Sequence, residues 1–316
     1  MKAVSILIGL FFLCLCGCAI EEASPFSNQQ LVIASDYLKP GDTALFSEFT
    51  KNSGIRIRIL SLTPEKIKTH LETHKSNAQF DVVMLGKLSS VITLEKTIFH
   101  NLSDAYLDKY ASNMKVFHNR QWFVTGLDPY FFSFERDSSA LPINYEQLAI
   151  GFLWASPDRD TWDLFDAHFS NYLSGLNEDR QAQLKNQFNI NQVQFFQPND
   201  SMRNQQFLIL KNSTFSATKT LNGNSKRELW KNTNSAQYGV YSDRYCMAIV
   251  DQAKNMRNAS EFLSYWDEHY QRENFIPAKG NYPYPNNEGL SKGVKFYMVS
   301  EDKLIELLKK QKIKEN

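Results

Sequence analysis

The segment LVIASDYLKPGDTALFSEFTKNSGIRIRIL, residues 31–60, carries in turn the patterns of a strand, a helix and a second strand. Its first five residues are a short apolar run of the strand type. Leu45 and Phe49 then lie four positions apart, the spacing that places two apolar side chains on one face of a helix. Gly54 is expected to end this helix. The closing IRIRIL alternates apolar and basic residues, which predicts a half-buried strand.

The residues that follow repeat the helix and the strand. Thr63 and Pro64 open a second predicted helix, which has Ile67 and Leu71 on its inner face. FDVVML, residues 80–85, is a continuous apolar run, as expected for a strand covered on both faces. This order predicts a parallel sheet wrapped by helices. Because IRIRIL tolerates charge on one face, we place it at the sheet edge, with the first strand between it and FDVVML.

The same pattern begins again in the second half of the chain. FLWAS (residues 152–156) and VQFF (residues 193–196) are predicted strands, and a helical apolar pattern follows the first of them. YCMAIV (residues 245–250) is another predicted strand, and the helix after it is expected to start with a capping box of Asn258 and Glu261. We therefore predict two α/β lobes, the first formed by residues 31–127 and 245–316 and the second by residues 128–244.

Residues 1–17 have the features of a secretory signal peptide. Lys2 precedes an apolar run of signal-peptide length, shorter than the roughly 20 residues that span a bilayer. LCGC, residues 15–18, resembles the bacterial lipobox, which implies cleavage before Cys18 and attachment of lipid to that cysteine. A zinc clip built from the clustered cysteines is the alternative, but no second half of such a site lies nearby in the sequence. Residues 18–30 would then be a tether.

The compartment and the charge narrow the range of functions. The lipobox predicts a lipid-anchored protein of the bacterial cell envelope, on the periplasmic face or at the outer membrane. Removal of residues 1–17 would leave 34 basic and 34 acidic residues, so the charge balance does not favour a nucleic-acid partner. Cys246 would be the one cysteine without lipid, and no intrachain disulfide is expected.

Ligands of open α/β sheets bind beyond the carboxyl ends of the strands, where the chain reverses its direction of travel across the sheet. In the first lobe this point falls between the first strand and FDVVML. The matching loops of the second lobe lead into helix starts, where free backbone N–H groups favour an anion, although capping alone would account for Asp160 and Asp200. We expect the two sets of loops to face each other across a gap. The candidate ligand-binding residues are Ser35, Asp36, Tyr37, Gly86 and Lys87 in the first lobe, and Ser156, Arg159, Asp160, Thr161, Asp200 and Ser201 in the second.

Several segments in this order resemble bacterial extracellular solute-binding proteins that serve ABC importers, and the closest group is the ferric-ion-binding type. They are residues 31–85, QWFVTGLDPYFFSFERD, FFQPNDSMRN, AKNMRNASEFLSYW and GNYPYPNN, which together span about residues 31 to 290. The resemblance implies a two-lobed periplasmic-binding-protein-like fold of type II, in which parallel-sheet lobes are joined by crossover strands and close on a ligand. It also implies a small-molecule solute, an ABC permease as partner and a monomeric chain.

The same resemblance reveals departures from an iron site. Iron-binding members hold the metal with adjacent tyrosines in the second lobe and with a histidine, often accompanied by an acid, in the first. Here Leu38 stands where the histidine is expected, and Gly86 and Lys87 follow FDVVML without an acid. KNSTFSATKT, residues 211–220, contains no tyrosine. The sequence therefore predicts neither a metal nor a cofactor, and ferric iron held by non-standard ligands is kept as an alternative.

The residue types of the predicted cleft favour a polar, anionic or polyol-like solute. Basic groups would attract an anion, hydroxyl groups can donate or accept hydrogen bonds, and aromatic rings can stack on a ligand or simply pack. The side chains behind this expectation are Lys87, Arg159, Ser156, Ser216 and Thr218, with Tyr37, Tyr130 and Phe131 as candidate stacking residues.

The sequence also bears on two other functions, an enzyme and an interaction protein without a ligand. The chain contains no G-x-S-x-G elbow, P-loop or G-x-G-x-x-G motif, and we expect no enzyme activity. His70 and His74 lie four positions apart, but the zincin pattern needs glutamate directly after the first histidine, and Glu72 is two places on. We interpret these histidines as structural. An interaction lipoprotein that keeps the fold without a ligand is the rival function.

Overall fold

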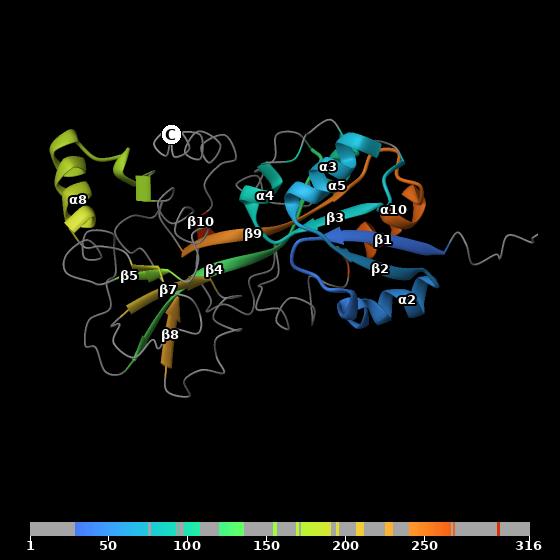
Figure 1. Ribbon diagram of the computed structural model, residues 1–316, viewed down its shortest axis with the longest axis horizontal. Helices are drawn as coiled ribbons and strands as arrows, with labels where there is room; N and C mark the ends of the chain where they lie inside the picture. Colours follow the sequence, from blue (N-terminus) through green and yellow to red (C-terminus); the bar gives the residue numbers. More distant parts are fainter. Residues whose placement is uncertain are drawn as a thin grey trace, which may run out of the picture.

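The computed structural model describes residues 29–74, 77–92, 94, 98–107, 120–135, 154–156, 169–170, 172–190, 194–195, 207–211, 225–229, 240–266, 268 and 296–297. Figure 1 shows them as two groups of strands with long strands running between the groups. Within these residues, no helix has the length and apolar character needed to cross a membrane.

The three strands predicted in the first lobe form one parallel group. β1 (Gln30–Ser35) lies between β2 (Arg56–Ser61) and β3 (Val82–Leu85). β2 stands at the end of the strand order, and its Arg56 and Arg58 are exposed, whereas every residue of β3 is buried. The predicted strand order and the edge position of the charged strand are confirmed.

The first predicted helix forms as two consecutive pieces. η1 (Pro40–Phe46) is a 3-10 helix, and α2 (Ser47–Ser53) continues it as an α-helix. Asp42 Oδ2 accepts the Lys39 N–H at 2.8 Å, so a side chain of the first turn holds the tight start of η1. Gly54 ends α2 with a φ of 74°, and its N–H donates into the last turn. The predicted glycine stop is confirmed.

The second predicted helix, α3 (Pro64–His74), begins where the sequence indicates, and Ile67 and Leu71 are fully buried. The backbone N–H of Lys66 donates to Thr63 Oγ1 at 3.4 Å, so Thr63 caps the N-terminus of the helix. The inner face of α3 therefore matches the spacing of its apolar residues.

The histidine pair of α3 makes structural contacts. His70 Nε2 accepts the Gln79 N–H at 3.1 Å, and its ring centroid lies 5.1 Å from that of Phe80 and 4.4 Å from that of His74. The part of the chain that the structure describes contains no group of three or more metal-ligating side chains. These contacts support the structural interpretation of the pair.

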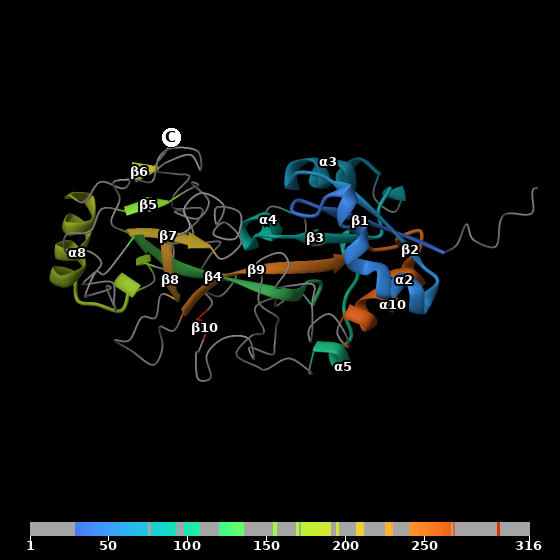
Figure 2. The ribbon, with the colours of Figure 1, turned by 90° about the horizontal axis from the view of Figure 1, so that it is seen from below.

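α10 (Met256–Tyr265) packs its apolar face against the first helix. The ring of Phe262 lies 5.5 Å from that of Phe46 and 5.1 Å from that of Phe49, measured between centroids. Trp266, just beyond the helix, is fully buried. Figure 2 shows α2 and α10 beside each other, with α3 on the opposite side of β3.

The capping box expected at Asn258 is wrong. The cap of α10 is Asn255, three residues earlier, and the buried carboxylate of Asp81 accepts its backbone N–H at 2.9 Å and its side-chain amide at 3.1 Å. Asp81 also accepts the Val32 N–H at 2.9 Å. Asn258 instead donates to the Gln30 carbonyl at 3.0 Å. The helix start is therefore set by a carboxylate distant in sequence, which a local pattern does not reveal.

Two long strands connect this group to the rest of the molecule. β9 (Val240–Ile249), which contains most of the predicted YCMAIV strand, pairs antiparallel with β3. β4 (Phe123–Glu135) pairs antiparallel with β9 along its first half, and with β7 (Phe207–Lys211) and β8 (Ser225–Leu229) along its second half. Figures 1 and 2 show β4 and β9 side by side between the two groups.

The second group repeats the parallel arrangement. β5 (Trp154–Ser156) lies between β7 and β6 (Gln194–Phe195) and is parallel to both. β5 and β6 fall within the two segments predicted as strands, residues 152–156 and 193–196. β10 (Phe296–Tyr297) pairs parallel with β9. Each group thus contains parallel strands, and antiparallel crossover strands join the groups. The remaining described helices are α4 (Leu88–Ile92), α5 (Asp104–Leu107) and α8 (Glu178–Ile190).

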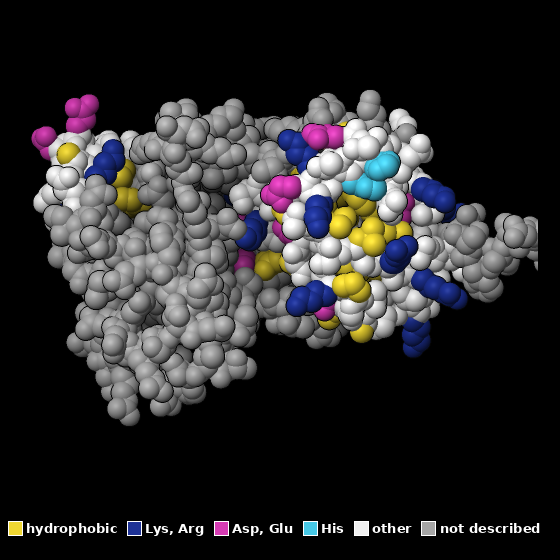
Figure 3. All heavy atoms as spheres, viewed as in Figure 1, with side chains coloured by type: hydrophobic (Ala, Val, Ile, Leu, Met, Phe, Trp, Pro, Cys, Tyr) yellow, Lys and Arg dark blue, Asp and Glu magenta, His cyan; other side chains and the backbone are white. Residues whose placement is uncertain are grey.

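Charged side chains are mixed over the described part of the face seen in Figure 3. Lys and Arg side chains lie scattered there, with Asp and Glu side chains between some of them. This distribution agrees with the balanced charge of the sequence. It offers no case, on that part of the face, for a nucleic-acid interface.

Candidate ligand-binding pocket

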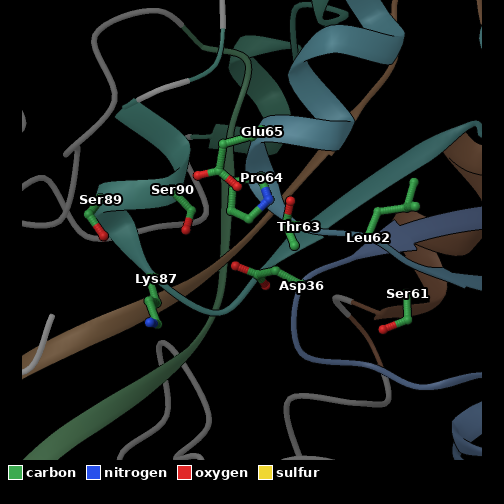
Figure 4. A pocket seen from close by; sticks show the side chains of 9 residues that line it. All are labelled: Asp36, Ser61, Leu62, Thr63, Pro64, Glu65, Lys87, Ser89 and Ser90. Carbon is green, nitrogen blue, oxygen red and sulfur yellow. The ribbon is translucent and has the colours of Figure 1, made fainter. Parts of the chain in front are cut away.

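A pocket of about 470 Å³ opens at the carboxyl ends of β1, β2 and β3 (Figure 4). Asp36 follows β1, Ser61 ends β2 and Lys87 follows β3, so each of three neighbouring strands contributes to its wall. This is the end of the sheet at which the sequence predicted a ligand. The other lining residues are Leu62, Thr63, Pro64, Glu65, Ser89 and Ser90.

Ser35 shapes the loop that carries Asp36. Ser35 is fully buried at the end of β1, and its Oγ accepts the N–H groups of Tyr37 at 3.3 Å and Leu38 at 3.1 Å. A hydroxyl that accepts these bonds stabilises a turn directly after the strand. Ser35 therefore holds Asp36 at the pocket without lining the pocket itself.

Asp36 joins two of the loops. Its Oδ1 accepts the Gly86 N–H at 2.8 Å, which ties the end of β1 to the end of β3. Figure 4 shows the carboxylate turned toward Lys87 and Ser90, both on the β3 side of the pocket. Glu65, in the first turn of α3, adds a second carboxylate to the lining. The described wall thus carries groups of both charge signs.

Burial raises the pKa of Asp36 above its ordinary value of 3.8. Hydrogen bonds from the Gly86 N–H and the Ser90 side chain act in the opposite direction, and so does the positive charge of Lys87. Desolvation is the largest of these effects, so the pKa remains raised. The cost of desolvating this carboxylate is a reason to look for a functional role rather than a stabilising one.

Gly86 lies between two tyrosine rings. The rings of Tyr37 and Tyr245 meet edge to face, with centroids 4.9 Å apart. A Cβ atom at Gly86 would lie 3.2 Å from Tyr37 Cδ1 and 3.3 Å from Tyr245 Cε1. Glycine is therefore needed here because the aromatic side chains approach the backbone closely, and not because of its backbone conformation.

Tyr37 packs rather than lines the pocket. Burial raises its pKa well above the ordinary value of 10.0, and the nearby charge of Asp36 raises it further. The phenol of Tyr37 is therefore neutral at physiological pH. Phenolate oxygen is the form that binds a hard metal ion, so the surroundings of Tyr37 oppose such a role.

The pocket loops are connected to the crossover strands through Tyr245. Its hydroxyl donates to Asp128 Oδ2 at 3.3 Å, and Asp128 is buried in the middle of β4. Asp243 and Arg244, the residues before Tyr245 in β9, are buried as well. This polar region was missed from the sequence, because nothing local indicates that residues 117 positions apart would meet.

The sequence also missed the contribution of β2 and of two helix starts to the pocket. Ser61, Thr63 and Glu65 come from the end of β2 and the start of α3, and Ser89 and Ser90 come from α4. Their signal was present, because a polar residue that follows a predicted parallel strand lies at the ligand-binding end of the sheet. Such residues are easily taken for helix caps alone.

No protein-family model matches the sequence, and no curated protein matches it. Solved structures do match. They include the ferric iron-binding protein A of Mannheimia haemolytica in an open conformation, with a TM-score of 0.72 and 12% identity over 89% of this chain and 96% of that one. The iron-bound HitA of Pseudomonas aeruginosa matches with a TM-score of 0.67 and 13% identity, over 90% and 98%. The Trichodesmium protein IdiA (FutA), in complex with iron and citrate, matches with a TM-score of 0.68 and 15% identity, over 89% and 98%.

The chain has the fold of the two-lobed periplasmic binding proteins. The fold expected from the resemblance in sequence is confirmed, with parallel strands in each lobe and β4 and β9 as the crossover strands. At identities of 12% to 15%, the similarity establishes the periplasmic-binding-protein fold and not the ligand.

Three of the other residues predicted for the site or for stacking lie in described strands. Ser156 is the last residue of β5, where it pairs with Phe195, and Tyr130 pairs with Lys211 across β4 and β7. Phe131 follows in β4. The remaining predicted residues lie outside the described residues: Cys18, Arg159, Asp160, Thr161, Asp200, Ser201, Ser216 and Thr218.

Leu38 is the residue at which the sequence departs from the expected histidine of an iron site. It stands where the resemblance in sequence leads us to expect a histidine, and its side chain is fully buried in the core. Lys87, directly after Gly86, lines the pocket and brings a positive charge to it. Asp36 and Glu65 could each bind a cation, but the described wall holds no third metal-ligating group with them.

Proposed function

We propose that this chain is a solute-binding protein that captures a small polar or anionic ligand between two lobes and delivers it to an ABC permease. The observation that carries the proposal is the pocket at the carboxyl ends of β1, β2 and β3, in a chain with the periplasmic-binding-protein fold. Ligands of open α/β sheets bind at that edge. The link from Gly86 through Tyr245 to Asp128 supports a connection between the pocket and the crossover strands.

In this proposal the first lobe consists of residues 31–127 and 245–316, and the second of residues 128–244. Closure of the lobes brings the second-lobe loops against the described pocket. The proposed contacts on that side are Tyr130, Ser156, Arg159, Asp160, Thr161, Asp200, Ser201, Ser216 and Thr218.

The proposed cellular location is the bacterial cell envelope. Residues 1–17 act as a lipoprotein signal peptide, Cys18 carries the lipid, and residues 18–30 tether the fold to the membrane. A match to the structure named periplasmic binding protein P5PA supports a periplasmic or envelope location, and the lipobox resemblance supports the anchor. A lipid anchor would keep a monomeric binding protein close to a membrane-bound permease.

Ferric iron is the second candidate cargo. Two of the matched structures contain iron, and others are described as ferric-binding proteins, which favours it. The described lobe disfavours it, because Leu38 is buried and Lys87 would repel a cation. A third candidate, an interaction lipoprotein without a ligand, would require the cleft to be filled by the chain's own side chains.

The proposed function is tested by combining thermal unfolding with small-angle X-ray scattering. The full chain, in mild detergent, is exposed in turn to sugars, amino acids, inorganic phosphate and ferric nitrilotriacetate. We expect at least one of these probes to raise the melting temperature and to reduce the radius of gyration, because a bound ligand holds the lobes closed. If none stabilises the protein and the scattering never changes, the solute-binding proposal is refuted.

A further inference from the structure

The described wall of the pocket is rich in hydroxyl groups. Ser61 and Thr63 come from the β2–α3 side, and Ser89 and Ser90 come from α4 (Figure 4). A hydroxyl donates one hydrogen bond and accepts others, so it can serve a ligand group of either kind. These four hydroxyls occur around one pocket of about 470 Å³, beside charges of both signs.

The charged groups of the wall oppose small ions of either sign. An inorganic anion entering the pocket would be attracted by the ammonium group of Lys87 and repelled by the carboxylates of Asp36 and Glu65, and a metal cation would meet the reverse. A neutral ligand meets neither repulsion, and it can donate to the carboxylates and accept from the ammonium group. A small ion of either sign therefore meets attraction and repulsion together, whereas every charged group of the wall can form a hydrogen bond with a neutral polar ligand.

The size of the pocket leads to the same class of ligand. Pockets for organic ligands measure roughly 300–1,000 Å³, and the pocket volume of about 470 Å³ lies within this range. Side-chain oxygens that hold a hard cation lie roughly 2.0–2.6 Å from it. A bare ion held by the described wall would therefore leave most of this volume unfilled.

Asp36 has capacity left for a ligand. A carboxylate offers about four acceptor positions, and the structure shows its Oδ1 accepting the Gly86 N–H at 2.8 Å, with Ser90 as a further donor. The bond to Gly86 fixes the carboxylate at the junction of β1 and β3, so a ligand hydroxyl would meet an acceptor that is already in place. Such preorganisation lowers the entropy cost of binding.

We propose that the solute is a neutral, hydroxyl-rich organic molecule, of the size class of a monosaccharide or cyclic polyol. The inference rests on the proposed solute-binding function and specifies the cargo of the same site. Asp36 and Glu65 accept hydrogen bonds from the solute's hydroxyls, Lys87 donates to them, and the hydroxyl side chains complete the wall.

Isothermal titration calorimetry of the full chain tests this inference. The probes are panels of monosaccharides, cyclic polyols and α-amino acids, with inorganic phosphate and ferric nitrilotriacetate titrated separately. We expect at least one monosaccharide or polyol to bind, and the amino acids, phosphate and ferric complex to leave the heat unchanged.

Matched variants of α3 and α4 locate the binding. Glu65→Gln should weaken the sugar or polyol about tenfold, because it replaces a charged acceptor by a neutral one. Ser89→Ala should weaken it about threefold to tenfold. Glu72→Gln, on the same helix but paired with Lys68 at the exposed surface (3.8 Å), should leave the affinity unchanged.

The outcomes separate the inference from the proposed function. Binding of ferric nitrilotriacetate, phosphate or an amino acid in place of every sugar and polyol would overturn the inference and leave solute binding standing. Sugar binding that Glu65→Gln and Ser89→Ala do not weaken would overturn the assignment of the sugar to this pocket. Absence of binding by every probe, together with unchanged scattering, would overturn both.

Discussion

The backbone N–H of Gly86 donates to Asp36 Oδ1 at 2.8 Å, and this bond joins the carboxyl ends of β1 and β3 at the candidate pocket. The two residues are 50 positions apart in the sequence, and β1 and β3 are neighbours in the sheet. The bond makes a partly buried carboxylate part of both the loop structure and the proposed binding surface. Its two roles can be separated by substitution.

Asp36→Asn and Asp36→Ala are predicted to differ in stability. An asparagine oxygen can still accept the Gly86 N–H while the desolvated charge is removed, so we expect Asp36→Asn to unfold at a temperature equal to or above that of the wild type at pH 7. Asp36→Ala leaves the Gly86 N–H without its acceptor, at a cost of about 1–3 kcal/mol. Both variants should lose affinity for the solute. Urea unfolding and calorimetry measure the two effects, and equal stability of the two variants would contradict the role of the bond.

The pH dependence of this residue has a defined sign. Because burial raises the pKa of Asp36, the folded state binds the proton more tightly than the unfolded chain does. Its contribution to the free energy of unfolding is therefore most favourable below the ordinary pKa of 3.8 and decreases as the pH rises through the folded pKa. Asp36→Asn should remove this decrease, which unfolding curves at pH values from 3 to 7 would reveal. If the wild type instead lost stability relative to Asp36→Asn as the pH fell, the prediction would be contradicted.

Gly86→Ala should destabilise the protein and weaken solute binding. Its Cβ would lie 3.2 Å and 3.3 Å from the rings of Tyr37 and Tyr245, so both rings must move by a few tenths of an ångström. We expect a loss of about 1–3 kcal/mol in the free energy of unfolding, as for other overpacked sites. Gly41→Ala is the matched control, because its Cβ would meet no atom within 4 Å. A Gly86→Ala variant as stable as Gly41→Ala would show that the rings adapt without cost.

Asp81 should be among the residues most sensitive to substitution in the first lobe. Its buried carboxylate accepts from Val32 N–H and from both the backbone and the side chain of Asn255, which links β1, β3 and α10. Asp81→Ala leaves these donors unpaired, and we expect a loss of about 3–5 kcal/mol in urea unfolding. Asp104→Ala is the control, because its ion pair with Arg120 is exposed and such pairs contribute roughly 0–1 kcal/mol. A loss for Asp81→Ala no greater than for Asp104→Ala would contradict the assigned role.

His70 should make the stability of the α3–β3 connection depend on pH. Burial and then the neighbouring His74 lower the pKa of His70 below its ordinary value of 6.5. Protonation would also convert Nε2 from an acceptor of the Gln79 N–H into a donor. The stability from this contact is present above pH 6.5 and is lost as the pH falls toward the folded pKa. His74→Gln should bring the pKa of His70 closer to its ordinary value and so reduce this loss, which melting temperatures between pH 5 and pH 8 would measure; an unchanged profile would argue against the coupling.

The elements of the first lobe could be predicted because their signals are local. β1, β2 and β3 each show a strand pattern within six residues, and Gly54 is a local stop for α2. β4 was harder, because Gly126 and Pro129 interrupt it and usually argue against a strand interior. The antiparallel pairing of β9 with β3 and β4 is a choice of distant partners, which no local pattern contains.

The difference between local signals and distant contacts also explains which residues of the candidate site could be predicted from the sequence. Asp36 and Lys87 could be predicted because they lie within two residues of the ends of predicted strands, and both line the pocket. Ser35 and Tyr37 were named from the same loop, yet their side chains serve the turn and the packing instead. Periodicity tells which residues lie at a strand end, but the direction of each side chain depends on tertiary contacts.

The most direct test of the central claim is a crystal structure of the full chain as purified from its own cell. We expect an organic molecule in the cleft, contacted by Asp36 and Lys87 from the first lobe and by Ser156 and Asp200 from the second. A structure in which these four residues lie on unrelated surfaces, or in which the chain's own side chains fill the space between the lobes, would contradict it.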